Sequence, residues 1–175
     1  NLLSVTRIEE GRMQIRQSAE LVDEVIREAL KHTGQSRTGR TIKVEEEDEL
    51  ILAKMDARLI VQVLINLIGN AVKYTPQGTD ITVRVKKEKT ENSQVIISVC
   101  DLGDGIPDDR KERVFDMFYT GSDQVADSRR SLGLGLGLCR SIINAHGGKI
   151  WISDNIPHGA VVTFTLPAEE VALNE

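Results

Sequence analysis

The chain has 175 residues, a length that suits one domain with a sizeable hydrophobic core. Hydrophobic residues make up 40% and charged residues 28% of it, as in ordinary globular domains. The formal net charge of −5 argues against a dedicated nucleic-acid-binding protein, because that class is usually basic. An anionic ligand would therefore depend on local donors rather than on the overall field of the molecule.

The N-terminal third of the sequence predicts two helices followed by two short strands. Apolar residues at helical spacing over residues 1–10, followed by a glycine, are typical of the last turns of a helix. Ser18 is the predicted N-cap of a second, amphipathic helix. Strands are expected over residues 41–44 and 50–54. The acidic run 45–49 between them predicts a solvent-exposed turn rather than an acidic partner site.

The remaining elements alternate irregularly along the chain. Asp56 is the predicted N-cap of a long central helix over residues 57–74. Two strands follow at residues 81–87 and 94–100, then a short helix at 109–115 and a mobile polar loop at 119–132. A helix at residues 134–145 and two strands at 149–153 and 160–166 complete the chain. Connections of the hairpin type imply an α/β two-layer sandwich, a mixed and largely antiparallel sheet covered on one face by helices.

Two features bear on the cellular setting. Cys100 and Cys139 lie in apolar runs without ligand-spaced partners, so buried free thiols and a reducing compartment are expected. No apolar stretch approaches the roughly 20 residues that span a bilayer, and no signal peptide is evident. Because the chain begins without Met and within a helical pattern, we expect it to be a piece of a longer protein.

The central helix carries an unusual polar face. Asn66, Asn70, Lys73 and Tyr74 recur at helical spacing, although asparagine is a poor helix former. A solvated stripe, or hydrogen bonds to a neighbouring loop, would account for this face taken alone. The functional alternative is that the amide oxygens bind Mg²⁺ bridging nucleotide phosphates, with Lys73 contacting a phosphate and Tyr74 offering an aromatic face.

A second polar segment follows directly on an apolar strand. The carboxylate of Asp101 ends the strand, and Gly103 and Gly105 come next. A carboxylate in this place can accept a hydrogen bond from an exocyclic amine such as adenine N6, while glycines let the backbone approach a flat ligand. For Gly103, Asp104 and Gly105 taken alone, an ordinary Asp-Gly turn is the better explanation, and Asp104 is the weaker carboxylate candidate because it has that turn role.

A third segment alternates glycine with leucine at the start of the last helix. Gly133, Gly135 and Gly137 would each cost about 1 kcal/mol relative to alanine within a helix, so they indicate close backbone approach. Free N–H groups at a helix start form a phosphate seat. The spacing differs from the dinucleotide-binding fingerprint and the Walker lysine is absent. Arg129 and Arg130 could reach the terminal phosphate or simply be solvated.

Together these segments resemble a known catalytic domain. With a fourth short segment, Phe115-Asp-Met-Phe118, they stand in one order, at residues 66–74, 101–106, 115–118 and 133–137. They correspond to the N, G1, F and G2 boxes of the ATP-binding domain of sensor histidine kinases, in the superfamily that also holds gyrase, Hsp90 and MutL ATPases. The resemblance covers about residues 18–167. It implies the sandwich fold inferred above, with the nucleotide beneath a flexible lid at about residues 119–132.

The resemblance also implies roles for individual residues. Asn70 resembles the Mg²⁺ ligand and Asn66 its neighbour in the site. Lys73 resembles a phosphate contact, Tyr74 a ring near adenine, and Asp101 the partner of adenine N6. The further nucleotide-contacting positions that it implies are Ile106, the glycines of both loops, the leucines between them and the preceding arginines, namely Gly103, Gly105, Ile106, Arg129, Arg130, Gly133, Leu134, Gly135, Leu136 and Gly137.

The chain departs from the family pattern in two places. Ser131-Leu132 stands where a Gly-Thr or Gly-Ser pair is usual, and Gly137 stands where alanine is common. These departures leave open the closed shape of the lid and the contacts to the γ-phosphate. The segment 118–137 is similar to that of potassium-responsive sensor kinases.

One position separates phosphoryl transfer from hydrolysis. ATP-hydrolysing relatives carry a water-activating glutamate four residues before the Mg²⁺ asparagine, whereas this chain has Asn66, which cannot act as a general base. The sequence context of the family's phosphoacceptor is found at none of the three histidines, His32, His146 and His158. The chain is therefore expected to bind Mg-ATP without phosphorylating itself.

The resemblance implies a protein-histidine kinase whose partners lie on other domains. The expected partners are ATP, a phosphoacceptor helical domain of the same or the dimer-mate chain, and a response-regulator receiver domain, with no nucleic acid. Residues 1–11 would be the end of the helical hairpin, 12–170 the ATP-binding domain and 171–175 a tail. The domain would be cytoplasmic, monomeric by itself, and part of a homodimeric inner-membrane protein. The alternatives are an anti-sigma-type Ser/Thr kinase, disfavoured by the helical remnant, and a nucleotide-sensing module without catalysis.

Overall fold

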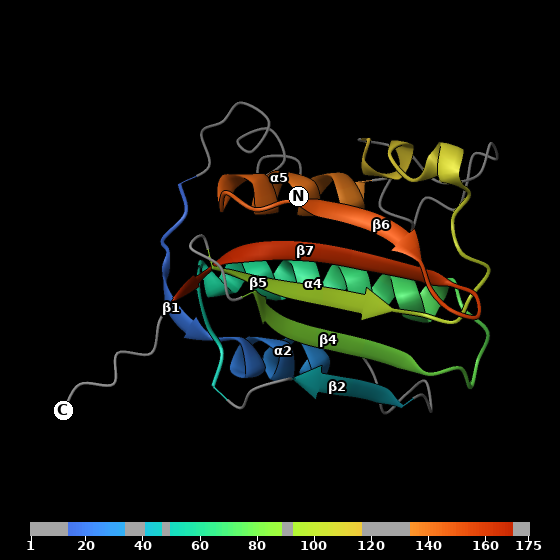
Figure 1. The fold of residues 1–175 in the computed structure, drawn as a ribbon, viewed down its shortest axis with the longest axis horizontal. Helices are drawn as coiled ribbons and strands as arrows, with labels where there is room; N and C mark the ends of the chain where they lie inside the picture. Colours follow the sequence, from blue (N-terminus) through green and yellow to red (C-terminus); the bar gives the residue numbers. More distant parts are fainter. Residues whose placement is uncertain (1–13, 34–40, 47–49, 89–92, 117–133, 170–175) are drawn as a thin grey trace.

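The computed structural model describes residues 14–33, 41–46, 50–88, 93–116 and 134–169. Within them a seven-stranded sheet packs against helices in two layers (Figure 1). The strands are β1 (Ser18–Leu21), β2 (Ile42–Glu46), β3 (Leu52–Met55), β4 (Ile81–Glu88), β5 (Gln94–Cys100), β6 (Ile150–Asp154) and β7 (Ala160–Glu169). The helices are α2 (Val22–Lys31), α4 (Ala57–Lys73) and α5 (Leu134–Ala145), with the 3-10 turns η1 (Asp108–Arg110) and η2 (Arg113–Phe115).

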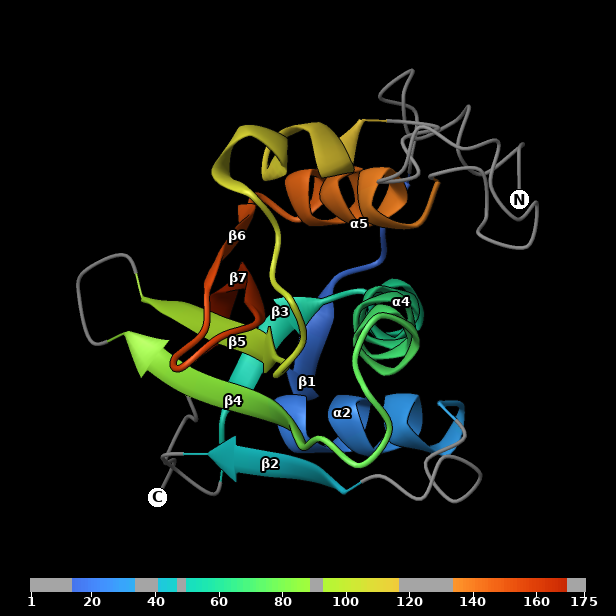
Figure 2. The same ribbon diagram turned by 90° about the vertical axis from the view of Figure 1, so that its right-hand side faces the viewer.

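The sheet is mixed but mostly antiparallel. Its order is β1-β3-β7-β5-β4-β2, with β6 paired to β7, and only the β2–β4 pair is parallel. Figure 2 shows α5, α4 and α2 stacked along one face of the sheet. The predicted sandwich, with helices on one face, is therefore confirmed.

The hydrophobic core lies between the sheet and the three helices. Strand alternation turns Val83 and Val85 of β4 toward Val99 and Ile97 of β5, and all four are buried. The helix α4 supplies the widest apolar stripe, through Ile60, Val63, Leu64, Leu67, Ile68 and Ala71. Because this stripe is fixed against the sheet, the opposite, polar face of α4 is held at a defined angle.

Three predicted elements differ from the structure. Ser18 is not a helix cap, because it begins β1, which pairs antiparallel with β3 from Ser18–Met55 to Leu21–Leu52. Pairing with β3 satisfies backbone groups that a helix would otherwise have used. Glu45 and Glu46 are strand residues rather than part of a turn, because β2 extends along β4. The expected short helix near Asp109 consists of two 3-10 turns.

The other described elements match their predictions to within a few residues. The helix α4 begins after Asp56 as expected, although the Asp56 side chain makes no capping hydrogen bond. Cys100 and Cys139 are buried free thiols. The predicted helical end at residues 1–10 and the loop at residues 119–132 lie outside the described residues. None of the described helices has both the length and the apolar character that crossing a bilayer requires.

Candidate functional site

The Asp101 carboxylate is held by the backbone in a single orientation. It follows β5, and its Oδ1 accepts hydrogen bonds from the N–H groups of Gly103 and Ala160, both at 3.0 Å. The Asn155 side-chain amide donates to the Asp101 carbonyl at 2.7 Å. With Oδ1 engaged by two donors, the described residues leave Oδ2 of this half-buried group as the acceptor for a ligand.

Glycines around Asp101 are required by the protein's own packing. A Cβ on Gly159 would lie 2.1 Å from the Asp101 carbonyl oxygen, and the φ of Gly159 is +111°. A Cβ on Gly103 would lie 2.8 Å from the Thr75 side chain and 3.1 Å from the Tyr74 carbonyl oxygen. Bulkier residues here would displace the carboxylate from its backbone donors.

The same contacts place the end of α4 beside the Asp101 loop. Tyr74, just past Lys73, reaches Gly103 through its backbone, while its side chain is exposed. One and two turns back along the helix, Asn70 and Asn66 are half-buried. The predicted Asn face therefore starts at the Asp101 loop and continues along α4, as the helical spacing requires.

The start of α5 lies against the other end of this face. A Cβ on Gly135 would lie 3.8 Å from Oδ1 of Asn66, an ordinary contact, so protein packing does not demand glycine at this position. The Cys139 thiol, one turn further, contacts the Val63 carbonyl at 3.9 Å. Burial raises the pKa of Cys139 to about 12, against the opposing effect of a hydrogen bond with Asn66. The thiol is thus a packing group rather than a nucleophile.

The segment between Asp101 and η2 is fixed to α5 and β6. Phe115 is buried in a small second core with Ile152 and Ala160. The Arg140 guanidinium of α5 lies 5.3 Å from the Phe115 ring centroid and 3.0 Å from a Glu112 carboxylate oxygen. Since the Ala160 N–H also binds Asp101, this second core links the adenine-binding candidate to α5.

The structure brings the described parts of all four predicted segments together, the third through Phe115, which packs with Ile106 and Leu136. Segments 66–74 and 101–106 meet at Gly103, and segment 66–74 meets α5 at Gly135. Arg129, Arg130 and Gly133 lie outside the described residues, and Leu134 is placed only as the first residue of α5. Ile106 and Leu136 pack around the second core, and Gly137 is buried.

Sequence reasoning missed the β6–β7 turn as part of the site. Asn155 and Gly159 hold Asp101, and Nδ1 of His158 donates to the Gly103 carbonyl at 2.9 Å. The signal available was a glycine directly before an apolar strand, which is common in ordinary turns. Only the antiparallel pairing of β7 with β5 brings this turn to Asp101.

The donor set fits a magnesium nucleotide. A backbone-oriented carboxylate suits an amine donor, half-buried amide oxygens are hard neutral ligands, and the start of α5 offers backbone N–H groups. The Asn66 amide lies beside Gly135 at the start of α5, while the Asp101 carboxylate lies at the other end of the polar face of α4. The arrangement can therefore orient a purine at one end and a triphosphate at the other.

Comparison with known proteins agrees with this geometry. Residues 55–170 match the family model of the histidine kinase-, DNA gyrase B-, and HSP90-like ATPases. The chain is 40% identical over 169 residues to sensor protein KdpD of Clostridium acetobutylicum, covering 97% of this chain and 18% of that protein. It is 34% identical to the adaptive-response sensory kinase SasA of Gloeothece citriformis, covering 95% and 42%. The chain thus spans less than half the length of these two relatives.

Solved structures give the same result. The nucleotide-free catalytic domain of histidine kinase ThkA superposes with a TM-score of 0.73 at 33% identity, covering 87% of this chain and 96% of that domain. ThkA in complex with the response regulator TrrA gives a TM-score of 0.75 at 29% identity, covering 96% and 47%. This chain belongs to the histidine kinase-, DNA gyrase B- and HSP90-like ATPase family, as a catalytic domain of the sensor histidine kinase type.

Proposed function

We propose that this domain binds Mg-ATP and donates its γ-phosphoryl group to a histidine on a separate helical domain. From there the group would pass to an aspartate of a response regulator. The single observation that carries the proposal is the Asp101 carboxylate, whose Oδ1 is saturated by two backbone donors so that Oδ2 is left for a ligand amine. Such fixed donors and acceptors are the main contribution a protein makes to phosphoryl transfer.

The individual roles follow from where each group lies. Asp101 would fix the adenine through N6, and Tyr74 would offer its exposed ring nearby. Asn70, with Asn66 beside it, would hold Mg²⁺, which when bound neutralises phosphate charge. Lys73 would contact a phosphate. The backbone of α5 from Gly135 to Gly137, with Gly133, Arg129 and Arg130 before it, would seat the phosphates.

The same residues favour transfer over hydrolysis. Asn66 is an amide and cannot take a proton from water. Its side chain is hydrogen-bonded to the Cys139 thiol, and burial raises the pKa of that thiol to about 12. Neither group can serve as a general base. The γ-phosphoryl group would therefore remain available for an incoming imidazole.

The whole protein would contain more than this domain. We propose that residues 1–11 end a phosphoacceptor hairpin, that residues 12–170 form the ATP-binding domain and that residues 171–175 are a tail. The parent would be a homodimer in the bacterial inner membrane with this domain on the cytoplasmic side. The ThkA–TrrA complex supports a receiver domain as the second partner.

The test is phosphoryl transfer in trans. The chain is mixed with a separately expressed phosphoacceptor hairpin and γ-labelled ATP, with and without Mg²⁺. We expect acid-labile label on the hairpin, lost when its acceptor histidine is replaced by glutamine and when Asp101→Asn is used. Acid-stable label on serine, or nucleotide binding with no label on any hairpin tried, including that of the 40% identical relative, would contradict the proposal.

A further inference from the structure

The helices α4 and α5 contact each other at three successive levels. The Asp56 N–H, directly before α4, donates to Nε2 of His146, directly after α5, at 3.0 Å. Val63 and Cys139 meet in the middle, at 3.9 Å between carbonyl oxygen and sulfur. Moving forward along α4 corresponds to moving backward along α5, so the helices are antiparallel and hold one register.

The third level is the proposed phosphate end of the site. Oδ1 of Asn66 lies 3.8 Å from the Cβ position of Gly135. About ten residues of helix separate this level from the Asp56 end, or about 15 Å at the rise of an α-helix. A helix is stiff along its axis, so an axial shift of α5 at His146 would be transmitted to Gly135.

The buried ring of His146 holds the two helices in that register through its hydrogen bonds. It is 2% exposed, and its Nδ1 lies 2.7 Å from the Ile142 carbonyl oxygen, which can only accept. Nδ1 therefore carries the proton, and Nε2 is the acceptor for the Asp56 N–H. The ring thus ties the last turn of α5 to the first residue before α4, and both of its nitrogens are used.

The chain entering the domain is attached at the same point. The Asp56 carboxylate, 3% exposed, accepts the Arg16 backbone N–H at 3.1 Å and two bonds from the Arg58 guanidinium at 3.1 and 3.3 Å. Arg16 precedes β1. A displacement of that segment would therefore act on the residue that holds His146.

We propose that His146 is a positioning residue for phosphate binding. By setting the axial register of α5 against α4, it fixes the distance between the Asn66 face and the Gly135 backbone. This inference goes beyond the binding groups themselves and rests on the proposed function, because those groups are the ones assigned to Mg-ATP.

The experiment compares three variants of the 175-residue chain by amide NMR. His146→Leu removes both ring hydrogen bonds at similar volume, and His146→Gln offers an oxygen near the Nε2 position. Thr163→Val is the control, because it removes a partly buried 2.9 Å hydrogen bond between the Thr163 and Ser98 hydroxyls, which joins β7 to β5 within the sheet. We expect His146→Leu to shift the Gly135 and Asn66 amide signals and spare Gly103. Thr163→Val should leave Gly135 unmoved.

Nucleotide affinity gives the functional readout. We expect His146→Leu to weaken Mg-ATP about tenfold, equivalent to about 1.4 kcal/mol, and AMP less than about twofold, because AMP lacks the outer phosphates. His146→Gln should recover most of this loss. A general loss of stability would lower both affinities, in Thr163→Val as well.

Two results would overturn the inference. The first is an unmoved Gly135 signal in both His146 variants, and the second is equal loss of ATP and AMP binding. If the unmutated chain bound no Mg-ATP, the proposed function would fail by itself. The shift comparison would still decide whether His146 sets the helix register.

Discussion

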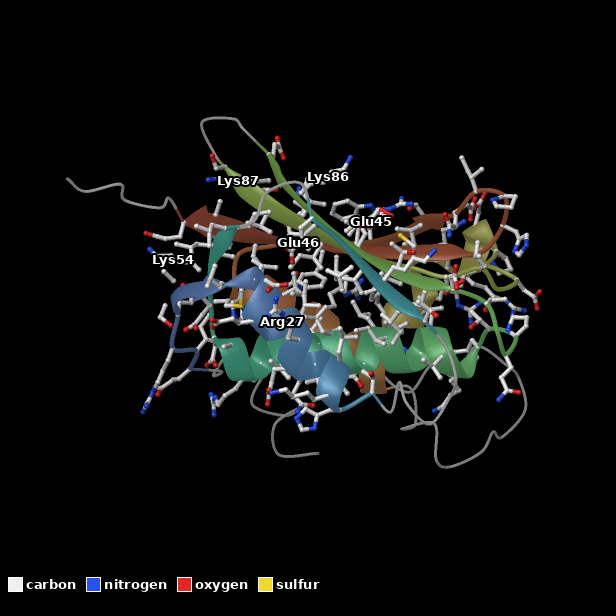
Figure 3. The ribbon with its side chains drawn as sticks, turned by 90° about the horizontal axis from the view of Figure 1, so that it is seen from below. Arg27, Glu45, Glu46, Lys54, Lys86 and Lys87 are labelled. Carbon is white, nitrogen blue, oxygen red and sulfur yellow. The ribbon has the colours of Figure 1, made fainter. Side chains whose placement is uncertain are left out.

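Replacing Glu46 by glutamine should stabilise the domain at alkaline pH and have little effect near pH 5. Glu46 ends β2 and is half-buried against α2, with Oε1 buried and without a hydrogen-bond partner among the described residues. Figure 3 labels Glu46, at the end of β2, and Arg27, on α2. Burial first, and then the charge and hydrogen bond of Asp23, raise the pKa of Glu46 from 4.5 to about 7, while Arg27 opposes the rise.

The sign of the effect follows from proton linkage. Between about pH 4.5 and about pH 7 the folded state binds a proton that the unfolded chain has released. Stability therefore falls as pH rises through this window and is level above it. The rise in the pKa from 4.5 to about 7 corresponds to at most about 3.4 kcal/mol. Solvent screening at this partly exposed site reduces the expected value to about 1–2 kcal/mol.

Urea unfolding at pH 5 and pH 8 measures the effect. The free energy of unfolding of Glu46→Gln should exceed that of the unmutated chain by about 1–2 kcal/mol more at pH 8 than at pH 5. Comparing two proteins at each pH cancels titrations that they share. Glu45→Gln is the matched control, since Glu45 is exposed on the neighbouring position of β2 and pairs with Arg84 at 3.5 Å. An equal gain at both pH values, or the same pattern in Glu45→Gln, would refute the reasoning.

Three further predictions concern the site and its frame. Asp101→Asn keeps an oxygen for Gly103 and Ala160 but turns a donor toward the ligand amine, so calorimetry should show at least about tenfold weaker ATP binding; near-normal affinity would reject the assignment. Asn70→Ala should abolish the Mg²⁺ dependence of nucleotide binding, and an unchanged Mg²⁺ titration would move the metal elsewhere. Gly148→Ala places a Cβ 1.9 Å from the Thr165 carbonyl oxygen and should cost at least about 2 kcal/mol in urea unfolding, whereas Gly69→Ala, with open space in the described structure, should gain up to about 1 kcal/mol. Equal effects of the two alanines would show that packing at Gly148 relaxes freely.

Local patterns in the sequence were enough for most of the elements. The apolar stripe of α4 and the alternation of β4 and β5 each identify one buried face, because helical and strand periodicities differ. The polar face with Asn66 and Asn70 follows from the same periodicity. Chemistry that is local in sequence, such as a carboxylate at a strand end followed within four residues by two glycines, was likewise visible.

Interactions between distant residues could not be predicted in this way. Serine is a residue type that commonly caps helices, yet pairing with β3 places Ser18 in β1. Glu46 lies in an acidic run that suggests solvent exposure, yet β2 pairs with β4 and brings it against Asp23 of α2. In both cases tertiary pairing outweighs local propensity.

The sequence by itself determined on which helix face or strand end the residues proposed to bind a nucleotide lie. Only the tertiary structure decided how they are held. The antiparallel pairing of β5 with β7 brings Gly159 and Asn155 to Asp101, and the packing of α5 on α4 brings His146 to Asp56. These partners are separated by tens of residues. Their contacts depend on the pairing of distant strands and on the register of two helices, which no local pattern encodes.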